Sequence, residues 1–192
     1  LLTWKRGEES YSVGGHIFQM QNAEKAQKMT WERAKEYCIG LNISLYGFRA
    51  DNFALPIDSE LLQLSQATRP YAHPNALYWT STTDREHQSY AKYVNINSGE
   101  NSWYKKHGKT YVLCTEKIDV DLTLPLEKLA KSLMDNKVSQ LSPAALQVTE
   151  DTSNRRALNA LEMALFLKYG NPVIQNVSYY KDDQVLSYEI IS

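Results

Sequence analysis

Cysteine, long apolar runs and excess basic charge are all scarce or missing in this sequence. Only two cysteines occur among 192 residues, and the formal net charge is −1. A protein that binds nucleic acid or anionic lipid through charge needs surplus lysine and arginine, so both classes are disfavoured. No run approaches the ~20 apolar residues of a spanning helix. The sequence therefore predicts no nucleic-acid partner and no membrane span.

Signatures of enzymes and metal sites are missing as well. No G-x-S-x-G elbow, P-loop or dinucleotide fingerprint occurs. The four histidines have no paired spacing of the kind that zinc sites use: His16, His73, His87 and His107. The start, "LLTWKRGEES", lacks the basic and apolar regions of a signal peptide. Because it begins with Leu, we expect a processed or trimmed fragment, whose destination this segment does not reveal.

Aromatic residues, in contrast, are plentiful. The chain has 13 tyrosines and 4 tryptophans, and 43% of its residues are hydrophobic. Such a chain can bury a core, and its rings can also form contact surfaces. Its length fits one medium domain or two small ones.

Two helices and four strands are expected before residue 117. The first helix follows Thr30, the candidate N-cap, and places Trp31, Ala34, Cys38 and Leu41 on one face. The second has Asp58 as its cap, with Ile57 and Leu62 as a hydrophobic staple. The strands are 16–21, 77–82, 90–96 and 109–115. "SWYKKHG" either extends the hairpin that turns at Gly99 or forms an exposed loop.

The rest of the chain is richer in helix and reads β-α-α-α-β-β. The expected order is a strand "IDVDLTL", helices in "PLEKLAKSLMDNK", "SPAALQVTED" and "NRRALNALEMALFLKYG", and a hairpin of "PVIQNVSYY" with "QVLSYEII". On the first of these helices, Leu126, Leu129, Ala130 and Leu133 share one face. We therefore predict an α+β chain with a boundary near Lys117, dividing it into domains 1–117 and 118–192. No flexible linker separates the halves.

The two cysteines leave two possibilities open. Cys38 and Cys114 could be buried free thiols of a cytosolic protein. They could instead form a disulfide that closes a loop of about 76 residues, worth at most ~4–5 kcal/mol in the chain-entropy model. The second possibility would place the protein outside the reducing cytosol.

Four segments in series resemble a known family. They are "MTWERAKEYCIGLN", "GFRADNFALPIDSELLQL", "YWTSTTD" and "YAKYVNINSGENSWYKKHGKTYVLC". Over about residues 15–116 the chain resembles the bacterial domain named after the C-terminal part of a Legionella collagen-like adhesin. The resemblance implies a C-type-lectin-like fold, similar in outline to the tip domains of intimin and invasin. It also implies a disulfide between Cys38 and Cys114, joining the first helix to the last strand. Residues 118–192 resemble no family.

The chain departs from that family in one segment. The family's compact R-L-P-T is stretched here into "FRADNFALPID", with extra residues between Arg49 and Leu55. We expect a longer or bulged loop before the second helix.

Cofactor chemistry known from related folds is not supported. "HPN" (73–75) looks like part of a lectin calcium site, but it precedes the strand that such a tripeptide should follow, and no W-N-D occurs. Copper-dependent formylglycine-generating enzymes need two neighbouring thiols, which a disulfide would consume. We expect no metal and no cofactor.

Surface recognition remains, with "NSGENSWYKKHGK" as the leading segment. Trp103 and Tyr104 stand there beside three cationic or titratable side chains, Lys105, Lys106 and His107. Exposed rings beside cations can contact protein or acidic glycan. The alternative is that Trp103 or Tyr104 faces the core. "RPYAHPNALY" is a second possible contact loop. If the first segment binds, the triple change Trp103→Ala, Lys105→Ala and Lys106→Ala should weaken binding.

These observations predict a non-enzymatic, calcium-independent adhesion module of the bacterial envelope or cell surface. Its partner would be a host or bacterial surface protein or glycan, and its location the periplasm, the outer-membrane surface or the extracellular space. The alternative is a structural subunit of an envelope assembly that binds another bacterial protein. An enzyme is the weakest of the three hypotheses, and the step from fold to function is analogy.

Overall fold

The fold is α+β, with antiparallel sheets and four helices among the described residues of the computed structural model. The structure describes residues 8–21, 26–66, 77–135, 152–169, 173–180 and 185–191. The predicted helix at 142–151 and the loop that contains His73 lie outside these residues. Within the described ranges, no helix combines the length and apolar character that crossing a membrane requires.

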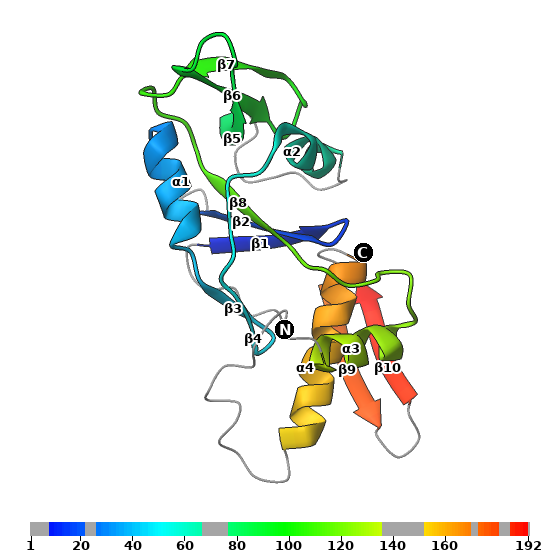
Figure 1. The fold of residues 1–192 in the computed structure, drawn as a ribbon. Helices are drawn as coiled ribbons and strands as arrows, with labels where there is room; N and C mark the ends of the chain where they lie inside the picture. Colours follow the sequence, from blue (N-terminus) through cyan, green and yellow to red (C-terminus); the bar gives the residue numbers. More distant parts are fainter. Residues whose placement is uncertain are drawn as a thin grey trace.

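Two three-stranded sheets form the body of the first half (Figure 1). One sheet has the order β1-β2-β8 and the other β5-β6-β7. Their strands are β1 (Glu8–Val13), β2 (His16–Gln21), β8 (Leu113–Lys117), β5 (Leu77–Thr83), β6 (Tyr90–Asn95) and β7 (Asn101–Lys105). A small hairpin joins β3 (Ile43–Leu45) to β4 (Phe48–Ala50). Each pairing between these strands is antiparallel.

Helix α1 (Trp31–Ile39) follows the sequence pattern closely. Trp31, Ala34 and Cys38 are buried, and Leu41 packs partly buried against the same cluster. Thr30 is the N-cap residue, as predicted, although its side chain makes no capping hydrogen bond. The apolar stripe therefore fixes the orientation of this helix, because the stripe is what enters the core.

Helix α2 (Asp58–Ser65) begins differently from the prediction. Its N-cap is Ile57 rather than Asp58, and Ile57 is 46% exposed, so the predicted hydrophobic staple with Leu62 is wrong. The side chain of Glu60 accepts a hydrogen bond from the backbone N–H of Ile57 at 3.2 Å. Asp58 is instead the first residue of the helix, and its carboxylate binds Thr82 and Lys92 outside the helix.

The predicted strand at 118–124 is absent, and this part of the chain turns instead. Asp121 Oδ1 accepts hydrogen bonds from the backbone N–H and the hydroxyl of Thr123, an arrangement that competes with an extended strand. Ile118 is still buried, and Leu122 and Leu124 pack partly buried against the core. The alternating apolar pattern was therefore a signal of burial and not of a strand.

The second half contains α3 (Leu126–Asp135), α4 (Thr152–Tyr169) and a hairpin of β9 (Val173–Tyr180) with β10 (Val185–Ile191). These match the predicted helices and hairpin. The four apolar positions predicted for α3 are all buried: Leu126, Leu129, Ala130 and Leu133.

The two halves share one hydrophobic cluster. Side chains from the first half such as Cys38 and Trp79 belong to the same buried cluster as Leu129 and Phe166. The ring of Tyr46, in the β3–β4 turn, lies 5.9 Å from that of Phe166 on α4. A second cluster, which includes Phe18, fills the space between the two sheets and α2. The domain boundary near Lys117 stays a prediction, and the two halves pack together across it.

Candidate binding surface

The β6–β7 hairpin carries the predicted contact segment. Its turn is built locally: Asn95 Oδ1 accepts from the backbone N–H groups of Asn97 and Ser98, and Gly99 takes a φ of 76°. "SWYK" continues from this turn within strand β7, and Lys106 begins the next turn, so the first of the two alternatives is correct for residues 102–105. All five residues of β7 are exposed.

Trp103 lies on the side of the sheet that carries α2. It is 41% exposed and stands opposite Lys92 in the register of β6 with β7. The Lys92 ammonium lies 5.5 Å from the centroid of the Trp103 ring. A cation at this distance from an indole is attracted to the ring's negative face. Trp103 is therefore a surface ring with a cation beside it, and not a core residue.

Tyr104 lies on the face of the sheet opposite to Trp103, and its ring packs on buried side chains. Its ring is 42% exposed and stacks on the fully buried Trp79 with centroids 5.8 Å apart. Tyr93 contacts it edge-on at 6.4 Å. An added Cβ at Gly108 would come within 2.2 Å of the Tyr104 ring, so the turn after β7 holds the ring from a third direction. Tyr104 thus joins the core at one face and meets solvent at the other.

Lys106 contacts the first residue of helix α1, Trp31. Its ammonium lies 4.3 Å from the centroid of the Trp31 ring, and Lys35 stands at the same distance. The backbone oxygen of Lys106 accepts from the N–H of Trp31 at 3.0 Å. Trp31 is only 6% exposed as a result. Lys106 therefore stabilises the start of α1 whether or not it contacts a partner, while Lys105 is exposed.

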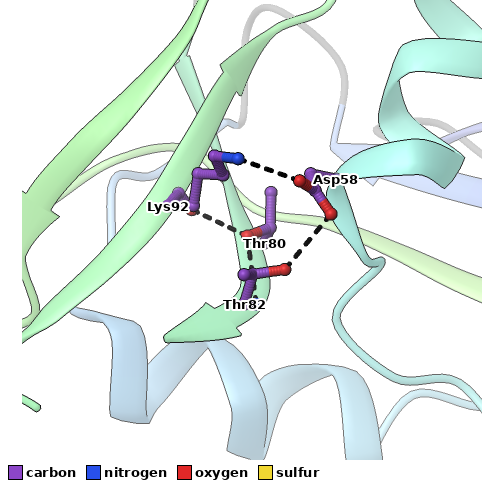
Figure 2. A network of polar contacts seen from close by, with 4 residues as sticks. All are labelled: Asp58, Thr80, Thr82 and Lys92. Carbon is purple, nitrogen blue, oxygen red and sulfur yellow. Dashed lines mark hydrogen bonds and ion pairs between the residues drawn. The ribbon is translucent and has the colours of Figure 1, made fainter. Parts of the chain in front are cut away.

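A polar network that the sequence did not predict holds Lys92 in place through Asp58 and Thr80 (Figure 2). Lys92 Nζ lies 3.0 Å from Asp58 Oδ2, and the hydroxyl of Thr82 donates to Asp58 Oδ1 at 3.3 Å. Thr80 Oγ1 donates to the backbone oxygen of Lys92 and accepts from the N–H of Thr82. The hydrogen bond from Lys92 is the main reason that the pKa of Asp58 lies below its ordinary value.

The network sits at an irregularity in the sheet. The register of β5 with β6 shifts between Trp79 and Thr83. Such a bulge re-aims side chains, and here it brings both threonines toward Asp58 and Lys92. The threonines of this network lie in the "TST" of "YWTST". From sequence alone that segment resembles an ordinary strand, because the residues that contact it in space are not known.

The disulfide between Cys38 and Cys114 is present, with an S–S distance of 2.06 Å. It ties α1 to β8, as the resemblance implied, and both residues are fully buried. The possibility of two free thiols is thereby excluded, since the described residues contain no free cysteine.

The stretched segment before α2 is built into the sheet. Ala54 and Thr115 of β8 exchange two backbone hydrogen bonds of 2.9 Å each. Glu116 accepts from the backbone N–H of Asn52 at 3.2 Å, and Phe53 is buried. Burial raises the pKa of the Glu116 carboxyl. The extra residues therefore extend the pairing at the edge of β8.

Two histidines of the described residues each lie beside one carboxylate. His16 Nε2 lies 3.3 Å from Glu60, and His87 Nδ1 lies 3.4 Å from Asp84. Among the residues that the structure places, no three His, Cys, Asp or Glu side chains gather closely enough to hold a metal ion. Our expectation that the protein uses no metal and no cofactor stays a prediction.

Comparison with known proteins adds a family and a distant structural similarity. The model of the Lcl C-terminal domain matches residues 1–116. Among solved structures, the natural killer cell receptor Ly49C is similar at a TM-score of 0.40 and 12% identity, covering 62% of this chain and 98% of that one. A similarity of this size carries no functional argument. No curated protein matches. The family match spans the disulfide, both sheets and the β6–β7 hairpin, and the chain belongs to the Lcl C-terminal domain family.

Proposed function

We propose that this chain is a non-enzymatic, calcium-independent binding module of an exported bacterial protein, which attaches to a surface protein or glycan through the β6–β7 hairpin. The observation that carries the proposal is the pair of half-exposed rings, Trp103 and Tyr104, on a strand whose side chains are otherwise polar or cationic. Rings of this kind are the usual anchors of binding surfaces, since they supply large contact area with few rotatable bonds.

Both rings are held in place before any partner arrives. Tyr104 stacks on Trp79, and Trp103 stands beside Lys92, which Asp58 holds in turn. Side chains that are already ordered lose less conformational entropy on binding, so more of the contact energy appears as affinity. A surface tryptophan with no such support would be a weaker argument.

The cationic side chains indicate the character of the partner. Lys92 lies across the hairpin from Trp103, and Lys105 lies two residues further along β7. Lys106 follows directly after the strand. Acidic groups on a protein or glycan would complement this charge.

The disulfide supports the assignment to an exported protein. A buried bond between Cys38 and Cys114 is expected to form in the periplasm or outside the cell and is rare in the cytosol. Membership of the Lcl C-terminal domain family agrees with a role at the cell surface.

The experiment is a binding screen of the intact chain against arrays of host matrix proteins and glycans, run beside a pull-down from the bacterium's own envelope. Specific binding to a host or surface ligand supports the proposal. Recovery of one envelope protein in defined stoichiometry, with both arrays blank, would instead support a scaffold subunit. Turnover of any substrate in the same samples would overturn the non-enzymatic assignment.

A further inference from the structure

Strand β7 is an open edge of its sheet. The sheet has the order β5-β6-β7, and no strand in the described part of the chain pairs with the outer side of β7. The other edge, at β5, is covered because residue Tyr111 exchanges backbone hydrogen bonds with Leu77 and Trp79. The hairpin therefore presents one uncovered row of backbone groups.

The register shows which backbone groups face outward. Asn95 N–H donates to Glu100 O, and Lys106 N–H donates to Ser89 O, both at 2.8 Å. These bonds fix the alternation of the antiparallel ladder, so that Ser102 and Tyr104 direct their backbone groups to β6. The intervening residues, Asn101, Trp103 and Lys105, direct their N–H groups away from the sheet.

This edge lacks most devices that natural edge strands use against pairing. It contains no proline, and its register with β6 is continuous over five residue pairs. Within the described residues, the turn that follows β7 occupies one outward group, since the N–H of Gly108 donates to the backbone oxygen of Lys105 at 2.8 Å. The device that is present is positive charge, at Lys105. Lysine at an edge deters pairing with a second copy of the same strand, but it attracts a strand that carries carboxylates.

The side chains repeat the same pattern on both faces of the edge. Trp103 and Lys105 follow each other on the face that carries α2, and Tyr104 and Lys106 on the face that carries α1. Glu100, just before β7, is the acidic exception. An added strand would thus meet an aromatic ring and then a cation on either side of its backbone.

We propose that the free edge of β7 receives an extended, acidic segment of a partner protein as a fourth strand of the β5-β6-β7 sheet. This inference rests on the proposed function and names its partner class and its mode of binding. Backbone hydrogen bonds to Asn101, Trp103 and the N–H of Lys105 supply affinity. On each face of the added strand, the ring and the cation select an apolar and an acidic side chain two residues apart, so that two apolar residues alternate with two acidic ones along the partner.

The test uses a labelled probe peptide, Thr-Glu-Glu-Val-Val-Glu-Glu-Thr with blocked ends, which presents both Glu and Val on each face, and the same peptide with Lys in place of Glu. The acidic peptide should bind the full chain with a dissociation constant of about 1 mM or tighter, the weak end of specific recognition. Nuclear magnetic resonance should show slowed amide hydrogen exchange at Asn101, Trp103 and Lys105 in the complex. Ser102 and Tyr104 should change little, because their N–H groups are already paired.

Two variants separate backbone pairing from side-chain contact. Asn101→Pro removes one outward N–H at the first residue of the strand, where proline is tolerated, and should weaken peptide binding roughly threefold to tenfold. Asn101→Ala keeps that N–H and should bind as the unchanged chain does. Equal affinity of the two variants would overturn edge pairing, as would binding of the basic peptide.

The remaining outcomes are equally decisive. Failure of the acidic peptide to bind would overturn the proposal. Slowed hydrogen exchange at the same three amides in a concentrated sample of the chain alone would also overturn it, because that result means that two copies pair through this edge. If the surface ligand found by the array screen still binds while the peptide does not, the proposed function stands and only edge pairing fails.

Discussion

The ammonium group of Lys92 lies 3.0 Å from a carboxylate oxygen of Asp58, and this ion pair joins strand β6 to the first turn of helix α2. The ion pair, the hydrogen bond from Thr80 to the Lys92 backbone and the pairing of β6 with β7 together hold Lys92 beside the Trp103 ring. The pair therefore links the packing of α2 to the shape of the candidate binding surface.

Asp58→Asn should lower the free energy of unfolding by up to about 1 kcal/mol near pH 7, because the pair is partly exposed and screened by solvent. The folded-state pKa of Asp58 is lowered, so its stabilising effect is full above the ordinary value of about 3.9 and is lost as pH falls through the folded pKa. Urea unfolding of both proteins at pH 7 and pH 3 measures this. Asp51→Asn, at a more exposed pair with Arg49, is the control and should change little.

The disulfide should supply a large part of the stability. Cys38→Ala with Cys114→Ala should lower the free energy of unfolding by about 4 kcal/mol, since the bridge closes a loop with a sequence separation of 76. Denaturant unfolding gives the value, and adding a reductant should affect the unchanged chain but not the variant. A loss below about 1 kcal/mol would contradict the chain-entropy argument.

Glu116 should respond to pH in the opposite sense from Asp58. Its pKa is raised, first by burial, so the folded state disfavours the charged form and stability falls as pH rises through the folded pKa. Glu116→Gln keeps an oxygen that can accept from Asn52 and should be more stable than the unchanged chain by about 1 kcal/mol near pH 7. The difference in the free energy of unfolding between the variant and the unchanged chain should vanish below about pH 4, where the carboxyl is protonated in both the folded and the unfolded state. A variant that is less stable at both pH values would mean that the ionised carboxylate is stabilising.

The predicted elements that were confirmed are those whose signals are local. The stripe of Trp31, Ala34 and Cys38 and the stripe of Leu126, Leu129, Ala130 and Leu133 each gave a helix with the correct buried face. Two strand-like runs on either side of the turn residues "KDD" gave the hairpin of β9 with β10. The pairing of Cys38 with Cys114 came from the family resemblance and not from spacing.

Most features that the sequence did not predict depend on contacts between distant residues. The β3–β4 turn has Tyr46 at a φ of 51°, which few aromatic residues adopt, and its ring packs against Phe166 from the far end of the chain. One missed feature was local, since strand β1 pairs with β2 through a turn of two glycines, Gly14 and Gly15, which is a hairpin signal in the sequence itself. Lys106 was assigned to a binding surface alone because nothing local indicated that Trp31 lies beneath it.

The close approach of Gly108 to Tyr104 allows a test of how firmly that ring is held. Gly108→Ala should lower stability by about 1–2 kcal/mol, because the new methyl group would overlap the ring. In a Tyr104→Ala background the same change should be nearly neutral, since the ring is gone. Thermal unfolding of the four proteins gives the coupling. Additive effects of the two changes would show that Tyr104 does not pack over Gly108.

The most direct test of the central claim is the affinity of the ligand from the binding screen for a double variant, Trp103→Ala with Lys105→Ala, which leaves Lys106 in place to cover Trp31. Its matched control is Met134→Ala with Lys131→Ala, which removes an exposed apolar side chain and an exposed lysine from α3. The account predicts that the β7 variant binds at least tenfold more weakly while the control binds normally. Equal affinity of the two variants would contradict it.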